Sequence, residues 1–197
     1  MTARGRFPAR LPHPRDVTHR PGARRVRAGR RCAWPVLALL LGAAPSGAQP
    51  PPADLQFLGF RPGAPLAEVE RQAAAHGATS LTCDTARRDA RVRECRGTLH
   101  ADTPTPLALR AVLIEGTAAI ILVTGAVPEA ERLRWERAME AAYGTVPMAA
   151  GGPQRMRQWI RRGTMLRLVW RGSTDAPEVS VSLVDGPTLD GWGRSLR

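Results

Sequence analysis

The chain has 197 residues and carries 29 Lys plus Arg against 17 Asp plus Glu, a net charge of +12. The excess lies at the start, since residues 1–48 hold ten Arg and one Asp, whereas residues 49–197 hold nineteen Arg and sixteen acidic residues. Residues 49–197 therefore have a nearly balanced surface, and their charge does not indicate a nucleic-acid-binding protein. Every basic residue is Arg and Asn is absent, a pattern typical of a GC-rich bacterial genome.

An uncharged apolar stretch covers residues 32–44 and follows the basic residues Arg27, Arg30 and Arg31. It is too short to span a bilayer, which needs about 20 residues. A basic segment, a short apolar core and a small-x-Ala site are typical of a secretory signal peptide. The sequence therefore predicts a signal peptide over residues 1–48, with cleavage between Ala48 and Gln49. The alternative is an amphipathic or core helix of a cytosolic domain.

The basic segment before this apolar stretch is longer than signal peptides normally have. One explanation is a start codon further downstream, near Val17 or Val26. The other is a twin-arginine signal built on Arg30 and Arg31. In both cases we expect the folded part to begin after residue 48, with a proline-rich tether over residues 49–54.

Two cysteines, Cys83 and Cys95, remain after the predicted signal peptide. In an exported protein such a pair most simply forms a disulfide. The segment between them is polar and turn-like, which suits two strands joined by an exposed loop. A metal site and a redox pair are the alternatives, but the spacing is not that of a zinc site, and only His76 and His100 could add ligands. The pattern favours a structural disulfide and predicts no metal.

The first half of the predicted domain spans residues 55–125. A short strand is expected over residues 55–60, followed by a helix that starts near Pro65 and stops at Gly77. Strands are expected around the cysteine loop, at residues 79–83 and 92–100. An apolar hairpin is expected over residues 107–114 and 118–123.

The pattern then repeats over residues 127–187. A helix is expected over residues 128–144, followed by a loop over residues 145–153. Three strands are expected at residues 155–160, 166–171 and 179–184, and a turn-rich segment over residues 185–193. The sequence thus predicts one α+β domain over residues 55–190, with helices on one face of an antiparallel sheet, in two tandem halves of a helix plus strands. Residues 191–197 are expected to be a tail.

The stretch GFRPGAPLAEVERQAAAHG, residues 59–77, resembles the opening of small envelope domains of the BamE/SmpA and beta-lactamase-inhibitor-protein type. The matching positions are Gly63, Leu66, Val69 and Gly77. The resemblance implies an α+β fold, and the inhibitor proteins are tandem α/β repeats whose sheet forms a binding surface. The lipoprotein members carry a lipidated Cys directly after the signal peptide, where this chain has Gln49, so no lipid anchor is expected.

Catalytic motifs are scarce in residues 49–197. There is no Gly-x-Ser-x-Gly sequence, and the absence of Lys excludes Ser-Lys chemistry. His100 and Asp102 could act as a base and its orienting group, although exposed residues at the end of a strand give the same pattern. We therefore assign no catalytic residue and expect no cofactor.

A candidate binding face lies in the last three predicted strands, where Arg and Trp alternate with apolar residues. Side chains on a strand point alternately to its two faces. A surface rich in Arg and Trp has the composition of a protein-interface hot spot. A solvated sheet face with no partner has the same residue pattern. The candidate residues are Arg155, Arg157, Trp159, Arg161, Arg167, Arg171, Ser180 and Ser182.

The sequence thus predicts an exported, non-enzymatic binding module in the periplasm or outside the cell. Its partner would be an envelope protein or an anionic ligand, not nucleic acid, and no transmembrane segment is expected after residue 48. A small hydrolase using His100 and Asp102, or a structural assembly factor, are the alternatives.

Overall fold

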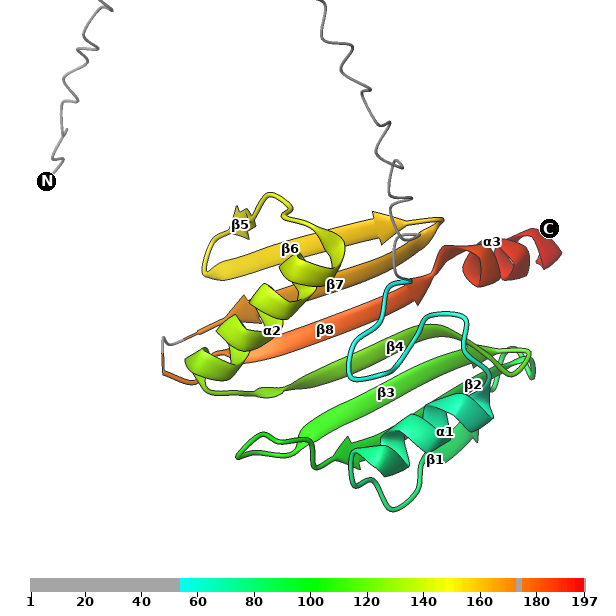
Figure 1. Ribbon diagram of the computed structural model, residues 1–197. Coiled ribbons are helices and arrows are strands. Elements are labelled where there is room, and N and C mark those ends of the chain that lie inside the picture. The colour runs from blue at the N-terminus through cyan, green and yellow to red at the C-terminus, as the bar shows by residue number, and fades with distance from the viewer. Residues whose placement is uncertain (1–53, 173–174, 197) are drawn as a thin grey trace, which may run out of the picture. The chain divides into compact units, whose positions relative to one another are not determined.

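A computed structural model describes residues 54–172 and 175–196. The predicted signal peptide, its cleavage site at Ala48 and Gln49, and most of the predicted tether lie outside the described residues. The described part is built on one antiparallel sheet of eight strands in the order β1-β2-β3-β4-β8-β7-β6-β5 (Figure 1). The expectation of an α+β fold with an antiparallel sheet is confirmed.

The elements follow one another as a helix and four strands, a second helix and four strands, and a final helix. They are α1 (Leu66–Ala75), β1 (Thr82–Thr85), β2 (Val92–Leu99), β3 (Leu107–Ile114), β4 (Thr117–Ala126), α2 (Glu129–Tyr143), β5 (Ala149–Gly151), β6 (Gln154–Arg161), β7 (Thr164–Arg171), β8 (Glu178–Asp185) and α3 (Gly186–Ser195).

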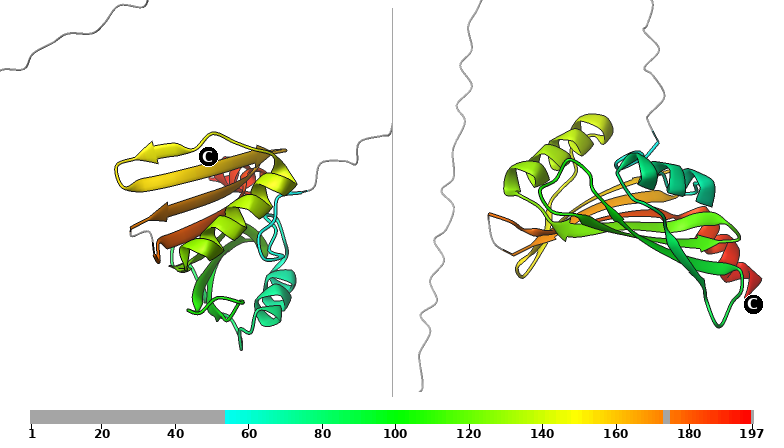
Figure 2. Two further views of the ribbon diagram at one scale, coloured as in Figure 1. Left: turned by 60° about the vertical axis from the view of Figure 1, so that its left-hand side comes forward. Right: turned by 90° about the horizontal axis from the view of Figure 1, so that it is seen from below.

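The last strand of each group lies in the middle of the sheet. β4 and β8 pair antiparallel, with Ile121 directly opposite Leu183, so that they join the two groups into one continuous sheet. The short strands β1 and β5 form the two edges. Helices α1 and α2 lie over the same face of this sheet, one over each group of strands (Figure 2). This face is called the covered face below, and the opposite one is called the open face.

The covered face carries the hydrophobic core. On β4 and β8 the buried side chains alternate with half-buried ones, as expected for strands whose two faces differ. From above, α1 contributes Val69 and Ala73, and α2 contributes Trp135 and Met139. Trp135 packs edge-on against Phe57 with their ring centroids 5.0 Å apart. The core therefore lies between the sheet, the two helices and the segment that precedes α1.

The helix boundaries follow the local signals in the sequence. Pro65 and Pro128 stand directly before α1 and α2, where a missing N–H costs nothing. Glu129 and Glu131 lie in the first turn of α2, where negative charge is favoured by the helix dipole. Gly144 ends α2 with φ 86°, a conformation that glycine adopts without strain.

Two tight turns set the register of the hairpins. Glu115 and Gly116 join β3 to β4, and Arg162 and Gly163 join β6 to β7, all four with positive φ. Such two-residue turns match the twist of the paired strands, and glycine at the second position lowers their cost. The prediction of strands on either side of both turns is confirmed.

The predicted strand over residues 55–60 is wrong. Phe57 and Phe60 instead close a small turn on themselves, each donating its backbone N–H to the other's carbonyl at 3.0 and 2.9 Å. Leu55, Phe57 and Phe60 are all buried. These residues are apolar because they are buried in the core. The periodicity of so short a run cannot distinguish a buried turn from a strand paired in a sheet.

The predicted turn-rich segment over residues 185–193 is also wrong, because it forms most of α3. The side chain of Asp185 caps this helix by accepting the backbone N–H of Thr188 at 3.1 Å. Trp192 donates its indole N–H to Asp89 at 2.8 Å, and Arg91 donates to Ser195 at 2.8 Å. These contacts with the β1–β2 loop stabilise a helix whose glycine content disfavours it locally. The short strand β5 likewise lies inside the loop predicted over residues 145–153.

Cys83 and Cys95 form the predicted disulfide and are direct partners across β1 and β2. Cys95 is fully buried beneath the covered face, so the bond anchors the short edge strand β1 to the core. In the part of the chain that the structure describes, no helix has the length and apolarity that crossing a bilayer requires.

Candidate binding surface

The eight candidate binding residues do not share one face of the sheet. Trp159 lies opposite Leu166, a fully buried residue of the covered face, and is itself only 2% exposed. Arg155, Arg157 and Arg161 alternate in step with Trp159 and therefore belong to the covered face as well. The remaining four candidates, Arg167, Arg171, Ser180 and Ser182, alternate with core residues and lie on the open face. The expected continuous Arg and Trp face is therefore wrong.

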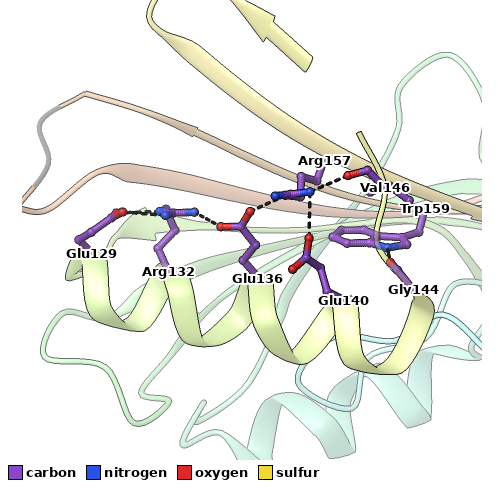
Figure 3. A network of polar contacts seen from close by, with 8 residues as sticks. All are labelled: Glu129, Arg132, Glu136, Glu140, Gly144, Val146, Arg157 and Trp159. Atoms are coloured by element: carbon purple, nitrogen blue, oxygen red, sulfur yellow. Dashed lines mark hydrogen bonds and ion pairs between the residues drawn. The ribbon is translucent and has the colours of Figure 1, made fainter. Parts of the chain in front are cut away.

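Arg157 joins β6 to α2 through a network of charged side chains (Figure 3). Arg157 is ion-paired with Glu136, contacts Glu140 at 2.9 Å and donates to the carbonyl of Val146 at 2.6 Å. Arg132 of the same helix bonds Glu136 at 2.6 Å on its other side. The acidic side chains of α2 thus point toward the sheet and neutralise the arginine below them.

The network continues to the start of α2, where Arg132 donates two hydrogen bonds to Glu129 at 2.6 and 2.7 Å. These bonds lower the pKa of the Glu129 carboxyl below its ordinary value. The same bonds raise the pKa of Arg132, which is only 4% exposed and lies over the ring of Trp170. This group of paired charges therefore has a structural role within the fold.

Trp159 and Arg161 have the same structural role at the end of α2. The indole N–H of Trp159 donates to the carbonyl of Gly144 at 2.7 Å. Arg161 donates to the carbonyl of Tyr143 at 2.8 Å, and its guanidinium lies 5.3 Å from the centre of that ring. These bonds satisfy carbonyl groups at the helix C-terminus, which have no partner within the helix.

One sequence signal could have revealed this arrangement. Arg132, Glu136 and Glu140 recur every four residues on the predicted helix over residues 128–144, so they lie on one side of it. A charged inner side of a helix requires charged partners on the strands beneath it, and β6 supplies Arg157. The strand pattern instead predicts an exposed binding face for the alternating arginines, because polar side chains usually lie at the surface.

The open face carries an apolar row that neither α1 nor α2 covers. The row consists of residues that are direct neighbours across five adjacent strands. The usual spacing between neighbouring strands gives the row a length of about 19 Å. Ile160 at its β6 end is 65% exposed, and the other members are half-buried. The members are Val112, Ile120, Val184, Met165 and Ile160.

A second row runs beside the first on the same face and contains Arg167 of β7. Arg167 pairs with Ser182 of β8 on one side and with Gln158 of β6 on the other. Along β7 its nearest neighbours on this face are Met165 and Val169. The open face therefore combines this apolar row with a half-buried guanidinium. The sequence pattern did not point to the apolar members of the row as functional residues.

The other open-face arginines have carboxylate partners. Arg96 and Arg110 both contact Glu94 at 2.7 Å. Their hydrogen bonds lower the pKa of Glu94 below its ordinary value. Arg171 forms an ion pair with Glu178 at 2.7 Å at the end of the neighbouring strand.

The residues of the hydrolase alternative do not form a catalytic pair here. His100 and Asp102 are both exposed, and in residues 54–172 and 175–196 no hydrogen bond or ion pair joins them. His76, the other histidine considered as a ligand, bonds the carbonyl of Leu58 at 2.8 Å and supports the turn before α1. Across the described ranges, no group of three side chains is arranged to hold a metal ion.

A cavity of about 640 Å³ lies between the segment that precedes α1 and the β6–β7 turn. Its charged groups are paired within the chain. Arg61 donates to Glu68 at 2.6 and 2.8 Å, and Arg162 contacts Asp54 at 3.3 Å. Among the described residues, the cavity therefore lacks an arginine without a carboxylate partner of the kind that Arg167 provides on the open face.

Comparison with known proteins gives no match to a family model, a curated protein or a solved structure.

Proposed function

We propose that this chain is an exported, non-enzymatic binding module that binds another protein through the open face. The observation that carries the proposal is the apolar row from Val112 to Ile160, which neither α1 nor α2 covers and whose end at Ile160 is 65% exposed. Uncovered apolar surfaces of this kind mark interaction sites in soluble proteins. Met and Arg, which lie side by side at Met165 and Arg167, are enriched in protein interfaces.

Export is supported by two independent features. The segment before residue 49 has the composition of a signal peptide. The disulfide between Cys83 and Cys95 suits an oxidising compartment such as the periplasm or the extracellular space. The repeated order of one helix and four strands also agrees with the proposed resemblance to tandem inhibitor domains, whose sheet forms the binding surface.

Site-specific photo-crosslinking in the organism that makes the protein tests the proposal. A photoreactive amino acid replaces Ile160 on the open face, or Leu133 on α2 as a matched control. Both are large apolar residues exposed to solvent, at 65% and 39%. We expect a discrete protein adduct from position 160 and none from position 133. Adducts from position 133 alone would contradict an interface on the open face.

A further inference from the structure

Arg167 is the open-face guanidinium that has no carboxylate partner within the described residues. Its Nε donates to the amide oxygen of Gln158 at 2.9 Å, and its Nη2 lies 3.5 Å from the sulfur of Met165. Both partners are neutral. The side chain is half-buried, so these contacts hold its guanidinium against the sheet.

This arrangement differs from that of every other arginine on the same face among the described residues. Glu94 neutralises Arg96 and Arg110, and Glu178 neutralises Arg171. At Arg167, apolar side chains and neutral polar groups take the places that carboxylates occupy elsewhere. Among the described residues, Arg167 thus places an uncompensated positive charge beside the apolar row.

The chemistry of a complementary partner follows from this combination. A guanidinium presents a planar fork of donors that fits a carboxylate or a phosphate. Nucleic acids and anionic membranes require several clustered cations for binding, because each contributes a small electrostatic gain. The described part of the face offers one such uncompensated cation, with apolar Met165 and Val169 along its own strand and neutral Ser182 and Gln158 on either side. A protein segment that carries one acidic group among apolar residues matches both properties.

We propose that the partner of the open face is a protein segment whose carboxylate pairs with Arg167 while its neighbouring apolar side chains lie on the apolar row. This inference rests on the proposed function and adds the chemistry of the partner. Exclusion of water by the surrounding contacts strengthens the attraction between the two charges. Arg167 would then set specificity, and Ile160 and Met165 would supply contact area.

Selection from a random peptide library displayed on phage tests this chemistry with the exported, disulfide-bonded protein, residues 49–197, as bait. We expect enriched peptides to combine Asp or Glu with Leu, Ile, Phe or Met. Fluorescence anisotropy then measures the affinity of the best peptide for the protein and its variants. Arg167→Gln should weaken binding about tenfold or more, as expected for loss of a charged hydrogen bond. Arg167→Lys, which keeps the charge without the fork, should weaken it less.

A double-mutant cycle ties the effect to the carboxylate. The peptide with its acidic residue changed to the amide should bind wild type as weakly as the original peptide binds Arg167→Gln. The two changes together should cost no more than either alone. Arg155→Gln is the matched control, because Arg155 lies on the covered face and bonds the carbonyl of Gly152. Unchanged affinity in that variant is expected, and thermal unfolding checks that each variant is folded.

The possible failures are distinguishable. If Ile160→Glu abolishes binding but Arg167→Gln does not, the open face is the site and the role of Arg167 is overturned. If neither variant affects binding, or no peptide is enriched, the proposed function fails as well. Flotation with vesicles of phosphatidylcholine and phosphatidylglycerol completes the test. Vesicle binding that is lost in Arg167→Gln, without any peptide binding, would overturn a protein partner in favour of a lipid surface.

Discussion

Arg157 of β6 and Glu136 of α2 form an ion pair on the covered face, with side chains only 18% and 10% exposed. Glu136 also accepts a hydrogen bond from Arg132, and Arg157 also contacts Glu140. The pair therefore lies at the centre of a charged network between a helix and the sheet beneath it. Partial burial makes such a pair costly to disrupt, because removal of one partner leaves the other uncompensated.

Replacement of Arg157 by Met should destabilise the fold by about 2–4 kcal/mol, since Glu136 and Glu140 then remain beneath α2 without this partner. Urea denaturation measures the change in the free energy of unfolding. Arg155→Met is the control, because Arg155 lies on the same strand but donates to the carbonyls of Gly152 and Gln154. That change should cost less than about 0.5 kcal/mol. Equal decreases in the free energy of unfolding of both variants would show that the charged network adds no stability beyond that of an ordinary surface arginine.

Reduction of the disulfide between Cys83 and Cys95 should destabilise the protein by about 3 kcal/mol, because the bond restricts the unfolded chain. The two cysteines are 12 residues apart in the sequence. Urea unfolding with and without reductant gives the difference. The double variant Cys83→Ala/Cys95→Ala should be insensitive to reductant. If reductant left the free energy of unfolding of the native protein unchanged, the bond would contribute no stabilisation.

Replacement of glycine by Ala should change the stability of the protein in opposite directions at two positions with open surroundings. A Cβ at Gly116 or Gly191 would meet no atom within 4 Å, so packing does not distinguish them. Gly116 has φ 81° in the β3–β4 turn, and Ala there should cost about 1 kcal/mol. Gly191 lies inside α3, where Ala should stabilise by about 0.5–1 kcal/mol. Thermal unfolding compares the two variants, and a loss of stability in Gly191→Ala would mean that α3 is not a helix in solution.

Acid should loosen the contact between α3 and the β1–β2 loop. Hydrogen bonds from Arg91 and then Trp192 hold the pKa of Asp89 far below its ordinary value. A lowered pKa means that the stabilisation is fully present above the unfolded Asp pKa of about 3.9 and is lost as pH falls below it. The indole N–H resonance of Trp192 should therefore shift in strong acid. In Asp89→Asn this shift should be absent, and an unchanged titration in that variant would point to another group.

Much of the architecture was predictable from local patterns. The helix at Pro128 and the hairpin strands on either side of Gly116 follow from start signals, turn residues and apolar alternation, which act over a few residues. The pairing of Cys83 with Cys95 followed from their being the two cysteines left after the predicted signal peptide. Short apolar runs were less informative, and residues 55–60 form a buried turn for that reason.

The sequence by itself determined the class of fold, the disulfide and most element boundaries, because these depend on neighbours along the chain. Only the tertiary structure decided which face of β6 is covered. Alternation shows that Arg157 and Ile160 point to opposite sides, but it does not show which side receives a helix. The covered side of β6 is the one that carries Trp159, which is 2% exposed, and Arg157, which pairs with Glu136 and Glu140 of α2. As a result, Ile160 and Arg167 lie together on the open face, where we propose the binding surface.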